Sequence, residues 1–285
     1  MKRILPLVAI CALMQAVPVF AMDLTVSAKT SGFAFDATGI PNPSPLRYGG
    51  ELTVEDQLSG GLSGQIALEL DPECGNMLKA RGIYRTRFLE ISAGPSFGIL
   101  NASGSNSVTS VIQPGLGIGF NLIAPGVAIA KADTDFALPT TSSADGRIFL
   151  QKSSLSAGIY LPNAICSFGI SQKTSTESGV KTTGLTDMGI YTEAFKKGSS
   201  IRISLDFIYR VMDYYIAAGS ASNTKTAHLI LGGGLNWEPK DDLSFFVKGD
   251  GSLYSFSLGS PLTGLDKFLF DVKVGVHYRI NTSQN

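Results

Sequence analysis

The chain has 285 residues, of which 44% are apolar and 16% are charged. An ordinary soluble domain has about 25% charged residues, yet no apolar run after the first twenty residues is long enough to cross a bilayer as a helix. The 23 basic residues balance the 23 acidic ones and form no cluster. A multi-helix membrane protein and a nucleic-acid partner are therefore both excluded.

The N-terminus has the pattern of an export signal. Lys2 and Arg3 precede the apolar stretch Ile4–Phe20, which ends at the small-residue motif Val19-Phe20-Ala21. We expect residues 1–21 to be a cleaved signal peptide and residues 22–285 to be the mature protein. Cleavage leaves 264 residues with 21 basic and 23 acidic side chains, a net charge of −2. A membrane-anchor helix is the alternative, but the stretch is interrupted by Pro18 and lacks a flanking charge cluster.

Apolar and polar residues alternate along most of the mature chain, which is typical of strands with one apolar face. The clearest examples are residues 62–70, 89–99, 201–211 and 268–280. In the third of these, Ile201, Leu205 and Phe207 share one face, and Asp206 and Arg210 share the other. The predicted strands are ten to fourteen residues long. Strands of globular proteins have about five or six residues, whereas a tilted transmembrane strand needs roughly nine to eleven.

Two alternating sets of turn signals divide these strands. The first set lies at residues 55–61, 85–87, 121–126, 161–163, 196–199 and 238–242, and the second at 36–45, 71–76, 101–107, 138–146, 174–179, 219–224 and 257–266. Six turns of one kind and seven of the other predict fourteen antiparallel strands with both termini on the same side. Alternation falters at residues 127–135 and 147–156, so twelve strands is the alternative.

An aromatic residue recurs just before the turns of the first set. These residues are Tyr84, Phe120, Tyr160, Tyr191, Trp237 and, at the chain end, Tyr278. Aromatic rings favour the boundary between the polar and apolar parts of a bilayer. The spacing of one ring per hairpin therefore predicts an aromatic rim, with ordinary strand aromatics as the alternative.

The polar face of the predicted strands carries many charged residues. The candidate pore-lining residues are Arg47, Glu51, Lys79, Arg81, Glu90, Arg202, Asp206, Arg210, Lys248, Asp250, Asp271 and Lys273. Buried charges must be paired or hydrated, so the interior is either water-filled or crossed by ion pairs. Barrels of about eight strands are filled by side chains, and those of sixteen to eighteen enclose a channel. Fourteen strands favour a channel, and the connections are too short to supply a substantial plug.

The signal peptide, amphipathic strands, short turns and aromatic rim together resemble the bacterial outer-membrane β-barrel class of porins and related channels. The resemblance covers residues 22–285 as an architecture, and no motif of one family carries over. The class usually ends on an aromatic residue, whereas this chain ends with residues 281–285, Asn-Thr-Ser-Gln-Asn. The resemblance implies a transmembrane, all-β, up-and-down antiparallel barrel in the outer membrane. Its partners would be outer-membrane lipid, periplasmic chaperones, the barrel-assembly machinery and small solutes.

Three functions fit these features. The first is a porin-like channel for passive diffusion of small solutes, the second a non-conducting structural or adhesive barrel, and the third an uptake route for small hydrophobic molecules. The sequence gives no sign of an enzyme, because His228 and His277 lie at opposite ends of their strands without a nucleophile motif. We expect no cofactor and no metal site, and Cys74 and Cys166 do not form a disulfide framework.

Overall fold

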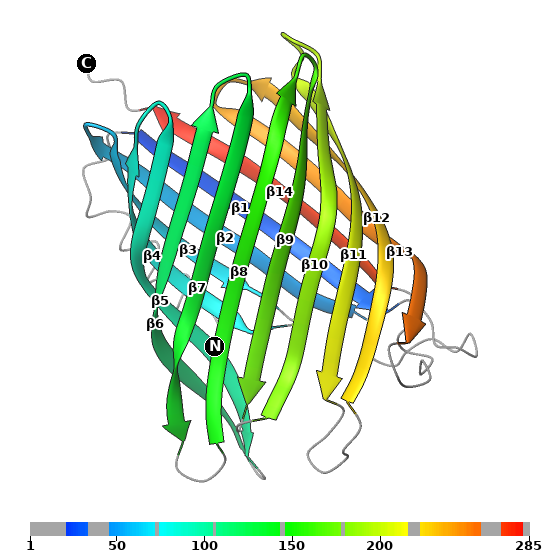
Figure 1. Ribbon diagram of the computed structural model, residues 1–285. Coiled ribbons are helices and arrows are strands. Elements are labelled where there is room, and N and C mark those ends of the chain that lie inside the picture. The colour runs from blue at the N-terminus through cyan, green and yellow to red at the C-terminus, as the bar shows by residue number, and fades with distance from the viewer. Residues whose placement is uncertain are drawn as a thin grey trace.

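A computed structural model describes residues 21–33, 46–71, 74–104, 107–142, 146–177, 180–215, 223–257 and 269–281. These residues form one closed antiparallel barrel of fourteen strands, in which each strand pairs with its neighbours in sequence and β1 pairs with β14 (Figure 1). No helix in this part of the chain is long and apolar enough to span a membrane. The prediction of fourteen strands is confirmed, and the alternative of twelve is wrong.

The strands differ in length from nine residues in β3 to eighteen in β6 and β12. The first seven are β1 (Ala21–Phe33), β2 (Leu46–Ser59), β3 (Leu62–Leu70), β4 (Asn76–Arg85), β5 (Leu89–Gly104), β6 (Ser107–Ala124) and β7 (Ala128–Ser142). The second seven are β8 (Gly146–Leu161), β9 (Ala164–Glu177), β10 (Val180–Phe195), β11 (Ile201–Tyr215), β12 (Asn223–Lys240), β13 (Leu243–Ser257) and β14 (Leu269–Asn281).

Several strands extend further than their sequence predicts. Asn121 to Ala124 belong to β6 and Asn101 to Gly104 to β5, although both segments read as turns. The two segments with weak alternation form β7 and β8, because pairing with neighbours on both sides satisfies their backbone. The β3–β4 hairpin is the exception, since its strands have only nine and ten residues.

The six tight turns of the first set all lie at one end of the barrel, which we call the turn end; the opposite end is the loop end. Gly60 and Gly61 join β2 to β3 with positive φ angles of 58° and 85°, a backbone that glycine adopts without strain. Ala21 pairs with Asn281 at the turn end, so the two described chain ends meet there. Residues 1–20 and 282–285 lie outside the described residues, and the signal peptide stays a prediction.

The two faces of the wall differ as the alternation predicts. Leu205 in β11 points outward and is 58% exposed, whereas the next residue, Asp206, points inward and is 3% exposed. Large apolar side chains are exposed on the outer face of every part of the barrel wall, among them Val26, Ile66, Ile118, Leu155, Ile190 and Val274. The barrel therefore has an apolar outside and a polar inside.

The predicted aromatic rim is only partly present. Tyr84, Phe120, Trp237 and Tyr278 are exposed on the outer face at the turn end, and Trp237 stacks on Phe245 with ring centroids 5.7 Å apart. Tyr191 instead points into the lumen, beneath the Nζ atom of Lys248. The prediction that Tyr160 and Tyr191 belong to the rim is wrong, because their neighbours Ile159 and Ile190 take the outward positions.

Candidate functional site

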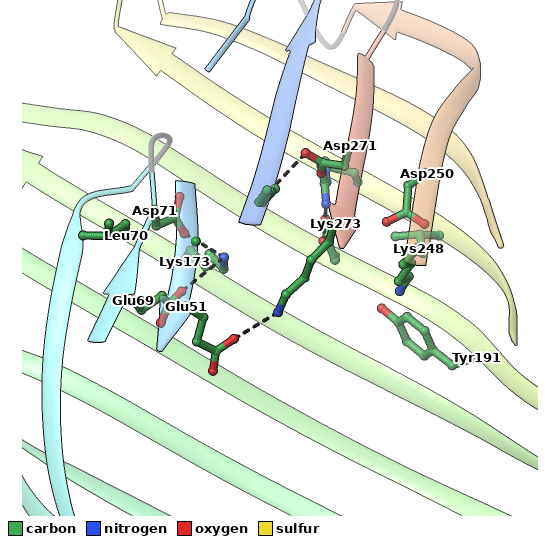
Figure 2. A pocket seen from close by; sticks show the side chains of 15 residues that line it. Glu51, Glu69, Leu70, Asp71, Lys173, Tyr191, Lys248, Asp250, Asp271 and Lys273 are labelled. Carbon is green, nitrogen blue, oxygen red and sulfur yellow. Dashed lines mark hydrogen bonds and ion pairs between the residues drawn. The ribbon is translucent and has the colours of Figure 1, made fainter. Parts of the chain in front are cut away.

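The lumen contains a polar cavity of about 270 Å³. Its wall carries five basic and six acidic side chains, which come from β1, β2, β3, β9, β10, β11, β13 and β14 and from Asp71, the residue after β3. Figure 2 shows Glu51, Lys173 and Lys273 among the residues around this cavity. The basic residues are Lys29, Lys173, Arg210, Lys248 and Lys273, and the acidic ones are Glu51, Glu69, Asp71, Asp187, Asp250 and Asp271. The near balance of charge means that most of these groups can be paired with one another.

One wall of the cavity belongs to a network of ion pairs that joins β3, β4, β7, β8 and β9. Lys79 lies 3.2 Å from Glu69 and 2.8 Å from Asp135. Arg81 donates hydrogen bonds to Asp135 and to both carboxylate oxygens of Asp133. The buried partners satisfy each other, which is the condition under which charges are tolerated away from water.

Glycines on β6 make room for this network. A Cβ atom at Gly117 would lie 2.1 Å from Asp135 Oδ1 and 2.9 Å from Arg81 Nη2. A Cβ atom at Gly119 would lie 2.4 Å from Ser92 Oγ, the acceptor of another Arg81 hydrogen bond. The glycine-rich segment of β6 therefore leaves space in the lumen for the Arg81 guanidinium and its partners.

The other wall of the cavity is built from β1, β10, β11, β13 and β14. Arg210 makes two hydrogen bonds of 2.8 Å to the carboxylate of Asp187 and lies 3.3 Å from Asp271. Lys29 also reaches Asp271, at 3.2 Å. Two further pairs complete this side, Lys248 with Asp206 at 2.5 Å and Lys273 with Glu51 at 3.0 Å.

The sheet register places like charges in rows on this wall. Asp206, Gly232, Asp250 and Asp271 are successive partners on β11 to β14. The next inward position toward the turn end is basic on three strands. There Lys248 of β13 lies opposite Lys273 of β14 in the sheet register, and Lys273 lies opposite Lys29 of β1. Asp250 Oδ1 has no hydrogen-bond donor among the described residues. The cavity therefore presents an acidic row beside a basic row.

An apolar layer lies above this cavity on the side of the loop end. Its members are Cys74, Met77, Ala137, Leu150, Leu185, Met212 and Leu269, which form one cluster and are 0–7% exposed. The layer reaches from β4 to β11, seven strands apart in a ring of fourteen, so it spans the barrel. Cys74 of the β3–β4 connection is buried in this layer, so this short connection contributes one side chain to the layer without supplying a substantial plug.

The apolar layer follows directly from strand geometry. On six strands, an inward apolar residue lies two positions toward the loop end from an inward charged residue. The six pairs are Met77 and Lys79, Ala137 and Asp135, Leu150 and Lys152, Leu185 and Asp187, Met212 and Arg210, and Leu269 and Asp271. Because residues two apart point to the same face, the lumen changes from charged to apolar over a single step.

The structure does not gather all twelve candidate pore-lining residues at one place. Six of them line the cavity, namely Glu51, Arg210, Lys248, Asp250, Asp271 and Lys273. Asp206 pairs with one of these, and Lys79 and Arg81 belong to the network on the opposite wall. Two more form ion pairs at the turn end: Glu90 with Arg85, and Arg202 with both Glu193 and Glu238. Arg47 is exposed near the loop end of β2.

Several residues that line the cavity lie outside the set predicted from the sequence. Lys29, Asp71, Lys173, Asp187 and Tyr191 line the cavity without having been selected as candidates. All of them except Asp71 lie in strands, at positions whose side chains point inward. The alternation of apolar and polar residues on β1, β9 and β10 could therefore have identified them. The apolar layer was missed because inward apolar residues such as Met212 interrupt the expected polar face.

The two histidines lie in different surroundings. His228 is fully buried, with Nδ1 2.7 Å from Ser255 Oγ and Nε2 3.0 Å from Thr226 Oγ1. His277 on β14 contacts Thr25 Oγ1 at 2.9 Å. No group of three or more potential metal ligands occurs among the described residues. Cys74 and Cys166 form no disulfide.

No family model and no curated protein matches the chain. Among solved structures, a Pseudomonas aeruginosa FadL homologue aligns with a TM-score of 0.54 at 9% identity, over 92% of this chain and 90% of that one. The CymD monoaromatic hydrocarbon channel aligns at 0.51 and 9% identity, over 94% and 90%. An outer-membrane channel from Pseudomonas putida F1 aligns at 0.50 and 10% identity, over 93% and 97%. At such identities the likeness establishes the fold, that of an outer-membrane β-barrel.

Proposed function

We propose that the chain is an exported protein that forms an outer-membrane channel for small solutes. The observation that carries this proposal is the charged cavity inside a closed barrel whose outer face is apolar. An apolar exterior suits lipid, and the strand lengths suit a tilted crossing of the hydrocarbon. The structures it resembles include a hydrocarbon channel and an outer-membrane channel, which supports the same class of function.

The charged cavity favours small hydrophilic solutes. Asp206, Asp250 and Asp271 form one row and Lys29, Lys248 and Lys273 the next, so a passing solute meets both signs of charge. Rings of charged side chains set ion preference in channels. The candidate pore-lining residues that belong to this wall would therefore determine which solutes pass.

A second candidate is passage of small hydrophobic molecules. The apolar layer across the lumen would favour an apolar solute and oppose a hydrated ion. A barrel of the same fold is a monoaromatic hydrocarbon channel. A non-conducting structural barrel is the third candidate, because ion pairs and the apolar layer occupy part of the lumen.

Conductance of the refolded protein in planar bilayers, combined with solute uptake into liposomes, separates these candidates. Neutral sugars, charged amino acids and a small aromatic hydrocarbon would be compared side by side. Entry of sugars or amino acids with measurable ion current supports the hydrophilic channel, and hydrocarbon uptake without current supports the second candidate. Absence of both current and uptake in repeated insertions would leave only a structural role.

A matched pair of variants links any current to the cavity. Asp250→Asn removes a cavity carboxylate, whereas Asp241→Asn removes one from the tight turn between β12 and β13. If the cavity is the conduction path, the first variant lowers the preference for cations and the second does not. An equal effect of the two would place the conduction path elsewhere.

A further inference from the structure

The half of the lumen nearer the turn end is accessible to water. On β14, the inward side chain of Arg279 is 47% exposed, that of Lys273 38% and that of Asp271 12%, so exposure falls with distance from the turn end. On β7, Lys131 is exposed near the turn end, whereas Asp135 is buried further along the strand. A solute that enters at the turn end therefore reaches the charged cavity through water.

The basic row lies in front of the acidic row on this path. Lys248 on β13 and Lys273 on β14 are each one inward position nearer the turn end than Asp250 and Asp271, which follow them on the same strands (Figure 2). Residues two apart in a strand are separated by roughly 7 Å. An entering solute therefore meets ammonium groups first and carboxylates second, within the length of one small molecule.

Asp250 differs from the other acidic side chains of the cavity. The other five each form an ion pair with a lysine or an arginine, whereas Asp250 forms none among the described residues. Asp206 and Asp271, which lie in the same row, already pair with Lys248 and Arg210. The acidic row therefore contains a carboxylate that suits the ammonium group of a solute.

The two lysines in front of Asp250 are suited to a carboxylate. Lys248 Nζ lies 5.8 Å from the centre of the Tyr191 ring and Lys273 Nζ lies 5.9 Å from that of Phe246, so an aromatic ring covers one side of each ammonium. An ammonium group has three N–H donors. Lys248 pairs with Asp206 and Lys273 with Glu51, and one carboxylate partner each leaves donors for a solute.

We propose that the cavity binds a small zwitterion with separated charges, such as an ω-amino acid, with its ammonium group at Asp250 and its carboxylate at Lys248 and Lys273. A zwitterion satisfies both rows at once. A singly charged solute of the same size finds a partner in one row and meets like charge in the other, which lowers its affinity. This inference rests on the proposed function, because it names the class of solute that the channel would pass.

Four solutes with the same four-carbon chain test this charge pattern. They are γ-aminobutyrate, butyrate, butylammonium and butyramide, and ligand-observed NMR titration of the refolded full-length protein measures the Kd of each. γ-Aminobutyrate should bind about tenfold more tightly than each of the others, because a hydrogen bond to a charged group is worth roughly one order of magnitude in affinity. Equal Kd values, no binding of γ-aminobutyrate, or tightest binding by a singly charged solute would overturn the proposal.

Variants assign the two ends of the solute. Asp250→Asn should weaken γ-aminobutyrate binding about tenfold without weakening butyrate binding, and Lys273→Met should weaken the binding of both. Asp241→Asn and Lys197→Met make the same chemical changes in exposed turns at the turn end and should leave every Kd unchanged. The heat-modifiable band on a gel confirms that each variant is folded. A folded Asp250→Asn protein with the wild-type Kd for γ-aminobutyrate, or an equal loss in Asp241→Asn, would contradict the assignment.

Transport assays distinguish failure of this site from failure of the channel. Liposome uptake of γ-aminobutyrate and of a neutral sugar is measured with the same refolded protein, together with ion current. Uptake of the sugar, with equal Kd values for the four solutes, rejects the zwitterion site and retains the channel. Selective binding of γ-aminobutyrate without uptake or current retains the site and rejects the channel.

Discussion

Lys173 Nζ lies 2.8 Å from Asp71 Oδ2, although the two residues are 102 positions apart in the sequence. Lys173 belongs to β9 and Asp71 follows β3, so the contact crosses the interior of the barrel rather than following the wall. The interior is therefore not a simple open tube. Its charged residues connect opposite walls of the barrel.

The outer face should not tolerate a charge. Leu205 is exposed on the outside of β11, where a bilayer would surround it. Leu205→Arg should weaken or abolish assembly, because an arginine near the bilayer midplane costs roughly 2–4 kcal/mol. The measurement is the fraction of heat-modifiable folded protein on a gel after refolding into lipid. Leu205→Phe is the control and should fold normally; a fully folded Leu205→Arg protein would show that this face does not contact lipid.

The neighbouring residue on the inner face should affect selectivity rather than folding. Asp206 pairs with Lys248 at 2.5 Å, so Asp206→Asn leaves Lys248 without its carboxylate partner. The lumen gains positive charge, and the ratio of anion to cation permeability should rise. Reversal potentials under a salt gradient measure this ratio. If the protein conducts and the ratio stays constant, Asp206 lies outside the conduction path.

The buried and the exposed ion pairs should differ in their contribution to stability. Arg81 is 7% exposed and binds two aspartates, whereas Arg279 is 47% exposed and binds Asp23. Arg81→Met leaves buried carboxylates poorly compensated and should lower the free energy of unfolding by about 3–5 kcal/mol. Arg279→Met should cost about 0–1 kcal/mol. Urea unfolding in lipid vesicles compares the two, and similar losses would mean that the Arg81 network is hydrated.

A methyl group on β6 should disturb the same network. A Cβ atom at Gly117 would overlap Asp135 Oδ1, at 2.1 Å, and crowd Arg81. Gly117→Ala should therefore destabilise the barrel by about 1–3 kcal/mol, the usual cost of overpacking. Gly64→Ala on β3 is a suitable comparison, since nothing lies within 4 Å of its added Cβ. The urea midpoints of the two variants give the result, and a stable Gly117→Ala protein would show that Arg81 can move aside.

The orientation of the barrel follows if the termini are periplasmic. Lys196 to Ser199 connect β10 to β11 at the turn end, together with Ala21 and Asn281. A protease site inserted there should be protected in intact cells, whereas one inserted after Gly104, where β5 ends at the loop end, should be cut. Western blots before and after permeabilisation read the outcome. Cleavage at residues 196–199 without permeabilisation would reverse the orientation.

The sequence by itself determined the number of strands and the face on which most side chains lie. The period of two depends only on the extended backbone, so Leu205 and Asp206 had to point to opposite sides once β11 formed. Turn residues with positive φ, such as Gly61 and Gly126, also act locally and mark the tight turns without tertiary information. These features survive because nothing distant is needed to produce them.

Tertiary structure decided the phase of the alternation where local signals agree. The tripeptide Gly-Ile-Tyr occurs at residues 82–84, 158–160 and 189–191, yet Tyr84 points outward and Tyr191 inward. On β4 the inward-facing positions are those of Arg81 and Ile83, so Tyr84 faces outward. On β10 the inward-facing positions include Asp187 and Tyr191. The orientation of each tyrosine is set by the register of the whole strand with its neighbours, which a tripeptide does not encode.

Only closure of the barrel decided which inward residues meet. Lys152 and Lys173 reach Asp71 because β8 and β9 face the β3–β4 hairpin across the lumen, and that distance depends on the strand number and tilt of the complete ring. The apolar layer arises in the same way, since Met77 and Met212 come from strands seven positions apart. Alternation predicts that such residues point inward, but the contacts between them exist only once β14 has paired with β1.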